Sequence, residues 1–337
     1  MSNNRYLSKH IRSFFEDHLV CRRKMSQCTI RSYRDAVKLF VQFVATHRRK
    51  AAANVLVTDI DDSIIDAFLM YLEKERGNSI QTRNHRLAIL RSLFNYVSLQ
   101  EPLFLEQCRQ VLNFPVQRRT AQPEISYLEK DEMECLFKAI DTRTALGRRN
   151  YAILRFMYNT GARVSEASDL RVSRLHFEPP PKVEILGKGS KWRTCPLWHS
   201  TAEILRNLID EQIGTANPAA HLFVNKSGNP LSRFGIYGVI AKYKEKASRS
   251  RPSLSQKILT PHTIRHTTAM HLLQAGVDIN VIRSWLGHAR LETTHRYVEI
   301  DLAMKAKALK VCEPENETVS CPEWRSNPDI LSWLEAL

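Results

Sequence analysis

The first 115 residues carry an apolar spacing that restricts them to helices. Apolar side chains recur every three or four residues between Thr29 and Val44, which is the period of one helix face. The same spacing covers Leu7–Val20, Asp61–Arg76 and Thr82–Ser98. Gly77 is placed to end the third of these segments. Four helices of this length predict a compact helical bundle.

Beyond residue 115 the sequence pattern changes. Residues 115–126 (PVQRRTAQPEIS) contain two prolines and little apolar pattern, which predicts a linker over 116–126. Lys182–Leu186 alternates like a strand, Gly187-Lys188-Gly189-Ser190 is typical of a tight turn, and Trp192–Leu197 is expected as the returning strand. Around this hairpin we expect a short strand at 221–225 and helices at 128–140, 149–158, 200–213, 232–247 and, with breaks, 261–311. The fold predicted is mainly α with a small β-hairpin.

The charge distribution favours nucleic acid as the partner. Residues 1–120 hold 20 Lys/Arg against 11 Asp/Glu, residues 121–311 hold 29 against 18, and residues 312–337 hold 1 against 6. Two basic segments are therefore followed by an acidic tail, and the net charge of +15 attracts polyanions. A basic surface that serves only solubility is the alternative.

Compartment and redox state follow from simpler features. No apolar run is long enough to cross a bilayer, and the N-terminus is too polar for a signal peptide. We therefore expect a cytoplasmic protein with no membrane partner. The seven cysteines form no C-x-x-C pair, which favours reduced thiols over a disulfide framework or a zinc module.

The segment Thr260-Pro261-His262-Thr263-Ile264-Arg265-His266 predicts a helix start, with the threonine as cap and the proline in the first turn. His262 and Arg265 then share a helix face, and a cation beside an imidazole suits phosphate chemistry. A core histidine and a surface arginine are the alternative interpretation. His262 and His266 have metal-like spacing, but the pair lacks the glutamate of a zinc protease, so no metal is predicted.

Two further cations occupy positions suited to phosphate. Arg163, in Thr160–Glu166 (TGARVSE), follows a glycine turn and can present two parallel N–H donors, while Glu166 could orient it. The alternative is a purely structural arginine paired with Glu166. Lys188 lies between two glycines at the hairpin tip, where it can reach DNA or give a proton to a leaving oxygen. An exposed turn lysine is the alternative, and the segment is not a phosphate-binding P-loop.

The last candidates follow the sequence Trp285-Leu286-Gly287-His288. His288 comes at a predicted turn, and Tyr297 lies on a predicted helix over 291–297. Taken singly, the histidine could be a capping residue and the tyrosine a half-buried core aromatic.

Together and in this order, T-G-A-R-V-S-E, G-K-G, T-P-H-T-I-R-H, L-G-H and the tyrosine resemble the tyrosine recombinase (phage integrase) family, most closely its Xer-type and transposon integrase branch. The resemblance implies a SAM-like DNA-binding domain over 1–115 and a catalytic domain over 127–311. It implies a site made of Arg163, Lys188, His262, Arg265, His288 and Tyr297, without metal or other cofactor. It also implies a tetramer on double-stranded DNA with specific recombination sites, with or without a related recombinase.

The implied reaction gives each of these residues a role. Tyr297 attacks the phosphodiester, His262 takes its proton, and Lys188 protonates the leaving 5′-oxygen. Arg163, Arg265 and His288 stabilise the charge on the non-bridging oxygens. The product is a 3′-phosphotyrosyl link, used in integration or excision of a mobile element or in Xer-like resolution.

Two other functions remain open on the sequence. A type IB topoisomerase uses the same nucleophile chemistry but rejoins the same strand, and a catalytically silent accessory protein would only bind DNA. The acidic tail over 312–337 ends in a predicted amphipathic helix, capped by Asn327, that docks in a neighbouring protomer or on its own domain. Unchanged tetramer assembly on DNA after deletion of 326–337 would exclude docking in the neighbour.

Overall fold

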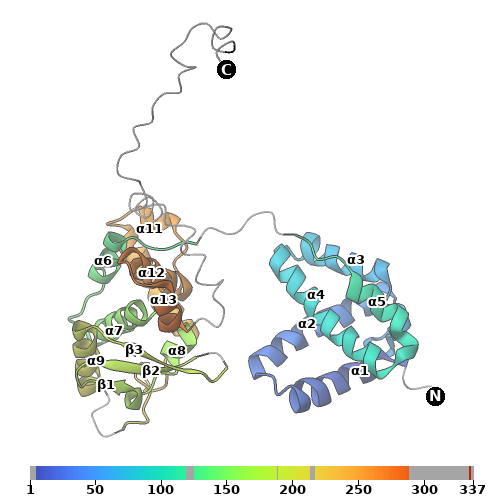
Figure 1. The fold of residues 1–337 in the computed structure, drawn as a ribbon, viewed down its shortest axis with the longest axis horizontal. Helices are drawn as coiled ribbons and strands as arrows, with labels where there is room; N and C mark the ends of the chain where they lie inside the picture. Colours follow the sequence, from blue (N-terminus) through green and yellow to red (C-terminus); the bar gives the residue numbers. More distant parts are fainter. Residues whose placement is uncertain (1–4, 119–124, 188, 213–216, 288–333, 335–337) are drawn as a thin grey trace. The chain divides into compact units, whose positions relative to one another are not determined.

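A computed structural model describes residues 5–118, 125–187, 189–212, 217–287 and 334 of the chain (Figure 1). The chain divides into two compact units, Met1–Pro123 and Glu124–Leu337. The finer boundaries predicted from the sequence stay predictions. No helix among the described residues is long and apolar enough to span a membrane.

The N-terminal unit is a bundle of helices that confirms the four predicted segments and adds a fifth. Its elements are α1 (Leu7–Ser13) continuing into the π-helical η2 (Phe14–Arg22), α2 (Gln27–His47), the short 3₁₀ turns η3 (Ala52–Asn54) and η4 (Val57–Asp59), α3 (Asp62–Met70) continuing into the π-helical η5 (Tyr71–Glu75), α4 (Ile80–Gln100), the 3₁₀ turn η6 (Pro102–Phe104), and α5 (Leu105–Asn113). The fifth helix, α5, packs against α4.

Local chemistry sets where these helices begin and end. Ser26, Asp61 and Ser79 each accept a hydrogen bond from the backbone N–H three residues on, so that one unpaired donor of each first turn is satisfied. Gly77 adopts a left-handed conformation after η5 (φ 60°), as expected for a helix end. The predicted apolar faces meet in a core that excludes solvent.

The C-terminal unit packs helices against a three-stranded sheet, which buries Val183, Ile185 and Cys195 on one face. Its elements are α6 (Lys130–Lys138), α7 (Ala145–Thr160), α8 (Val164–Ser168), the 3₁₀ turn η7 (Val172–Arg174), β1 (Leu175–His176), β2 (Lys182–Leu186), β3 (Trp192–Pro196), α9 (His199–Gln212), α10 (Arg233–Ser248), α11 (Ser253–Gln256), α12 (Pro261–Gln274) and α13 (Ile279–Leu286). The strands run antiparallel in the order β1-β2-β3, with Ile185 opposite Arg193.

The predicted fold class, mainly helical with a small sheet, is confirmed, and so is the hairpin at its predicted position. The short strand predicted over 221–225 is wrong, because His221 and Val224 make only isolated bridges, to Arg171 and Pro230 respectively. The helices predicted over 291–297 and at the C-terminus lie outside the described residues, apart from Leu334.

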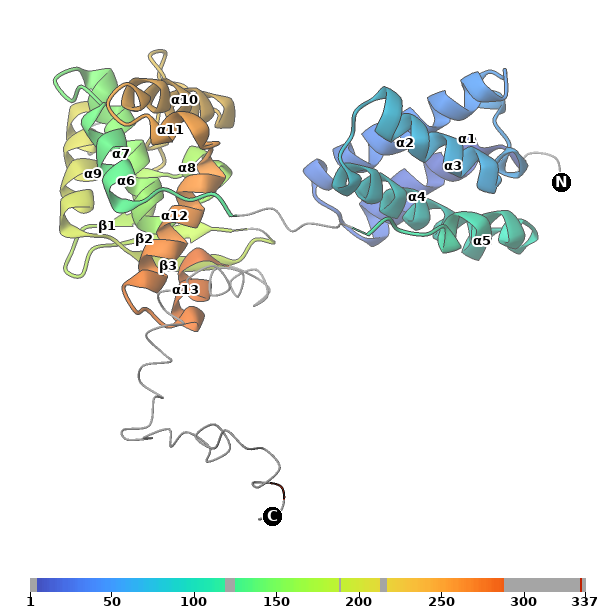
Figure 2. The same cartoon turned by 90° about the horizontal axis from the view of Figure 1, so that it is seen from above.

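Packing in this unit brings three distant chain segments together. The helix α12 lies along α7, and both helices are largely buried (Figure 2). The helix α13 then folds back on α12 through a buried apolar cluster that includes Met270, Leu273 and Leu286. The C-terminal ends of α7 and α13 consequently lie beside the first turns of α12, where the site is found.

Candidate active site

Arg163 is the N-cap residue of α8 and is held by a carboxylate of the same helix. The helix α7 ends at Gly161 in the left-handed conformation (φ 59°), which turns the chain into α8 two residues later. The Arg163 backbone N–H donates to Glu166 Oε2 at 2.9 Å, and its Nη1 donates to Glu166 Oε1 at 2.8 Å. The arginine side chain keeps 31% of its surface exposed, so it is oriented by Glu166 and still open to a ligand.

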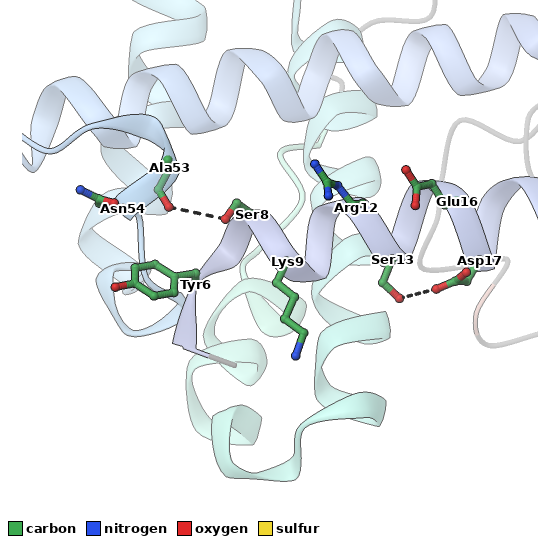
Figure 3. A pocket seen from close by; sticks show the side chains of 9 residues that line it. All are labelled: Tyr6, Ser8, Lys9, Arg12, Ser13, Glu16, Asp17, Ala53 and Asn54. Carbon is green, nitrogen blue, oxygen red and sulfur yellow. Dashed lines mark hydrogen bonds between the residues drawn. The ribbon is translucent and has the colours of Figure 1, made fainter. Parts of the chain in front are cut away.

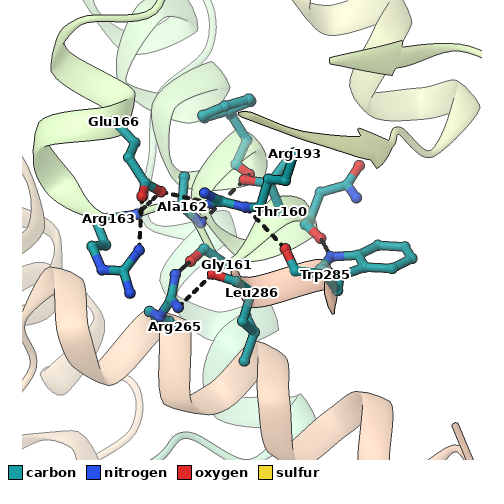
Figure 4. Close-up of polar contacts among 11 residues, drawn as sticks. Thr160, Gly161, Ala162, Arg163, Glu166, Arg193, Arg265, Trp285 and Leu286 are labelled. Atoms are coloured by element: carbon teal, nitrogen blue, oxygen red, sulfur yellow. Dashed lines mark hydrogen bonds and ion pairs between the residues drawn. The ribbon is translucent and has the colours of Figure 1, made fainter. Parts of the chain in front are cut away.

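Arg265 occupies the second turn of α12 and joins two other segments of the site. The predicted helix start is confirmed, because Thr260 accepts the Thr263 N–H at 3.1 Å. Only 1% of Arg265 is exposed. Its Nη1 donates to the Gly161 carbonyl at 2.7 Å and its Nη2 to the Leu286 carbonyl at 2.6 Å (Figure 4). The alternative of a surface arginine is therefore wrong.

Glu166 holds a second arginine that the sequence interpretation missed. Arg193, on β3, donates from Nη2 to Glu166 Oε2 at 2.6 Å and from Nε to the Trp285 carbonyl at 3.0 Å (Figure 4). Burial of Glu166 opposes its ionisation, but hydrogen bonds and charge from Arg193, and then hydrogen bonds from Arg163, outweigh burial and lower its pKa. The buried carboxylate of Glu166 thus binds both Arg163 and Arg193.

Replacing Glu166 by Ala should destabilise this unit strongly. The Arg193 side chain is 8% exposed and would lose its only carboxylate partner among the described residues. We expect the free energy of unfolding to fall by about 3–5 kcal/mol. All five tryptophans of the chain lie at or beyond residue 192, so fluorescence-detected urea unfolding follows the C-terminal unit. A loss below about 1 kcal/mol, the usual value for an exposed pair, would contradict this account.

His262 is exposed at the start of α12, with its ring centroid 4.7 Å from that of His266. Although the residue is exposed, the protein on one side partly desolvates the imidazolium, and this, together with positive charge from Arg265 and Arg163, places its pKa below the ordinary 6.5. The imidazole is therefore neutral at pH 7, as a general base requires.

For the DNA cleavage that the family resemblance implies, the lowered pKa of His262 gives an expected pH dependence. A neutral imidazole accepts a proton and a protonated one does not, so activity should be lost as the pH falls through the pKa of His262. We expect the midpoint of this acidic limb below pH 6.5 in the second-order rate constant for cleavage at subsaturating protein and DNA, which reports the DNA-free protein, and a His262→Gln variant should lack the limb. A wild-type midpoint at or above 6.5 would contradict the assignment.

Residues next to Lys188 and His288 in the sequence line one open pocket together with Arg163. The residues around it are Arg163, Gly187, Gly189, Lys191, Trp192, Arg193, Asn280, Arg283, Ser284 and Gly287. Lys188, His288 and Tyr297 lie outside the described residues. Among the predicted residues, the structure brings together Arg163, His262 and Arg265. Neighbours of Lys188 and His288 in the sequence line the pocket beside Arg163.

The remaining described surface offers weaker alternatives. An open pocket in the N-terminal unit is lined in part by Lys9, Arg12, Glu16 and Asp17 (Figure 3). Because its side chains carry both charges, it is less suited to phosphate than a basic pocket. Within the described ranges, no group of three or more His, Cys, Asp or Glu side chains is arranged to hold a metal ion.

Comparison with protein families gives two matches. Residues 126–303 match the model described as the phage integrase family, and residues 12–101 match the phage integrase N-terminal SAM-like domain. A Sinorhizobium fredii protein named as an integrase/recombinase (y4rC) is 36% identical over 337 residues, which is all of both chains. Tyrosine recombinase XerC of Bacillus pumilus is 30% identical over 292 residues, covering 85% of this chain and 90% of XerC.

Solved structures share the fold at lower identity. The Tn1549 transposon integrase in complex with transposon right end DNA superposes with a TM-score of 0.68 at 16% identity, over 91% of this chain and 98% of that one. The XerH recombinase bound to palindromic difH substrate gives a TM-score of 0.66 at 22% identity, over 87% of this chain and 82% of that one.

Proposed function

This chain belongs to the phage integrase family of tyrosine recombinases, and from that premise we propose that it cleaves and rejoins DNA strands through Tyr297. The observation that supports the proposal most is the proximity of Arg163, Arg265 and His262, of which Arg163 lines the pocket that Gly187, Gly189 and Gly287 also line. Cations beside a neutral imidazole suit attack on a phosphodiester.

The nucleophilic step needs a base and an anion clamp. A free tyrosine hydroxyl has a pKa near 10, so Tyr297 must lose its proton as it attacks phosphorus, and His262 accepts that proton. Negative charge develops on the non-bridging oxygens, where Arg163 and Arg265 donate hydrogen bonds with His288 as a further donor. Each such donor contributes a factor of about 10²–10³ in rate.

The leaving group also needs a proton. As the tyrosine–phosphorus bond forms, the bond from phosphorus to the 5′-oxygen breaks, and Lys188 protonates that oxygen. The product is a 3′-phosphotyrosyl ester with a free 5′-hydroxyl, so no external energy source is needed for rejoining. Attack by the 5′-hydroxyl of a second DNA partner completes strand exchange and frees Tyr297.

The substrate is double-stranded DNA carrying specific recombination sites. The basic charge of both units supports DNA binding, and the solved XerH and Tn1549 relatives are bound to DNA. We assign to the active form a tetramer on two sites, with a Holliday-junction intermediate. The biological role is integration or excision of a mobile element, with Xer-like resolution as the second candidate.

One experiment separates recombination from its two rivals. The full chain is incubated with supercoiled DNA that carries two candidate sites, and the products are resolved by size. Exchanged or deleted circles support a recombinase. Relaxed circles without exchange would identify topoisomerase-like activity, and DNA binding with neither product would identify an accessory protein.

A further inference from the structure

Arg193 connects the hairpin to the two other segments of the site. It lies on β3, opposite Ile185 of β2, and two residues beyond Lys191, whose carbonyl accepts the Gly187 N–H at 2.8 Å and closes the hairpin loop. Its side chain reaches Glu166 beside Arg163 and the Trp285 carbonyl at the end of α13 (Figure 4). The guanidinium group of Arg193 thus connects strand β3 to Glu166 on α8 and to the end of α13.

The third nitrogen of this guanidinium lies between two glycines. Nη1 is buried and has no hydrogen-bond partner among the described residues. A Cβ added at Gly187 would lie 3.4 Å from Nη1, and a Cβ added at Gly287 would lie 3.3 Å from Nη1 and 3.0 Å from Cδ. Because neither Gly187 nor Gly287 has a side chain, there is room beside both residues for the guanidinium group of Arg193.

We propose that Arg193 is a positioning residue. By binding Glu166, the partner of Arg163, it fixes the position of the β2–β3 hairpin and therefore of the loop that contains Lys188. This inference rests on the proposed function, because it acts through Lys188 as the acid for the leaving oxygen. Lys188 directly follows Gly187 in the sequence, so the position of the loop's base limits where this lysine can reach. Arg193 is the buried cation that fixes this base.

An arginine is specifically required by this geometry. Its planar fork donates in two directions at once, to a carboxylate on α8 and to a carbonyl on α13. A lysine can keep the charge beside Glu166, but it has a single nitrogen and does not reproduce both contacts. Arg193→Lys therefore preserves the buried ion pair while releasing one of the two attachments of the hairpin.

The test compares two leaving groups in single-turnover cleavage by the full chain. One substrate has the natural 5′-bridging oxygen, and the other has sulfur at that position, which leaves as a thiolate without needing a proton. We expect Arg193→Lys to cleave the oxygen substrate about 10²-fold more slowly than wild type, and the sulfur substrate within about threefold of wild type. Lys188→Ala should show the same pattern.

Two matched variants calibrate the result. Arg174 stacks on Trp192 at 4.2 Å and pairs with Glu184 on the same hairpin, but it does not line the pocket of Arg163, so Arg174→Lys should change neither rate. Arg163→Lys should slow both substrates, because it weakens the oxyanion clamp rather than the acid. Fluorescence-detected unfolding verifies that each variant is folded before rates are compared.

The outcomes are distinguishable. If Arg193→Lys cleaves the oxygen substrate like wild type, or is equally slow on both substrates, the positioning role is overturned. Should Arg193→Lys fail to fold, Arg193→Gln, which keeps a donor for the Trp285 carbonyl, is compared on the same two substrates, and the same two results would overturn the role. If wild type itself forms no covalent adduct on either substrate, the proposed function fails instead.

Discussion

Tyr297→Phe is expected to abolish covalent attachment to a nicked DNA site while leaving DNA affinity within about twofold of wild type. The substitution removes only the attacking oxygen, and the phosphate contacts that dominate affinity come from basic side chains. Denaturing gels reveal the covalent adduct, and fluorescence anisotropy at fixed salt measures affinity.

The control for this variant is another tyrosine. Tyr237 is 44% exposed on α10, and Tyr237→Phe removes the same oxygen from a position that does not line the pocket of Arg163. It should form adduct at the wild-type rate. Adduct formation by Tyr297→Phe at more than about one hundredth of the wild-type rate would show that another group is the nucleophile.

Arg265→Gln should lose both activity and stability. Removing one oxyanion donor lowers the cleavage rate by about 10²–10³-fold. The buried carbonyls of Gly161 and Leu286 would also lose their bonds to the guanidinium, which we expect to reduce the free energy of unfolding by about 1–3 kcal/mol. Single-turnover cleavage and tryptophan-detected urea unfolding measure the two effects.

Arg163→Gln is the matched comparison. Arg163 is partly exposed, and its partner Glu166 keeps Arg193, so we expect a similar loss of rate with less than about 1 kcal/mol of destabilisation. The difference in destabilisation between the two variants follows from burial, because Arg265 is buried and Arg163 is partly exposed. Equal destabilisation by both variants, or an Arg265→Gln variant as stable as wild type, would contradict the packing described for α12.

Much of the fold could be predicted because its signals are local. The apolar period found the first four helices, and Thr260 with Pro261 marked the start of α12 as observed. The glycines beside Lys188 marked a turn, and β2 and β3 flank it as expected. Each of these features depends on residues within one or two helical turns of one another.

The features that were not correctly predicted from the sequence depend on contacts between distant residues. The helix α5 follows a proline turn, and its buried side chains, Cys108 and Val111, show their role only against α4. Arg193 is one of many basic residues in the sequence, and its partners lie 27 and 92 positions away. The strand expected at 221–225 had the right composition but lacks a neighbouring strand to complete a ladder.

The candidate site was predictable as a set of residues and not as a geometry. The order of motifs indicated Arg163, His262 and Arg265, and the structure brings these three together. The nearly complete burial of Arg265 could not be read from an H-x-x-R pattern, because the carbonyls that bind it come from the ends of α7 and α13.

Strand cleavage is expected to leave the 3′-phosphate of DNA on Tyr297. The most direct measurement traps the covalent complex on a nicked site, digests the protein and the DNA, and locates the residual nucleotide by tandem mass spectrometry. We expect a single modified residue, Tyr297, esterified to a 3′-phosphate. A nucleotide attached through its 5′-phosphate, or attached to any other residue, would contradict it.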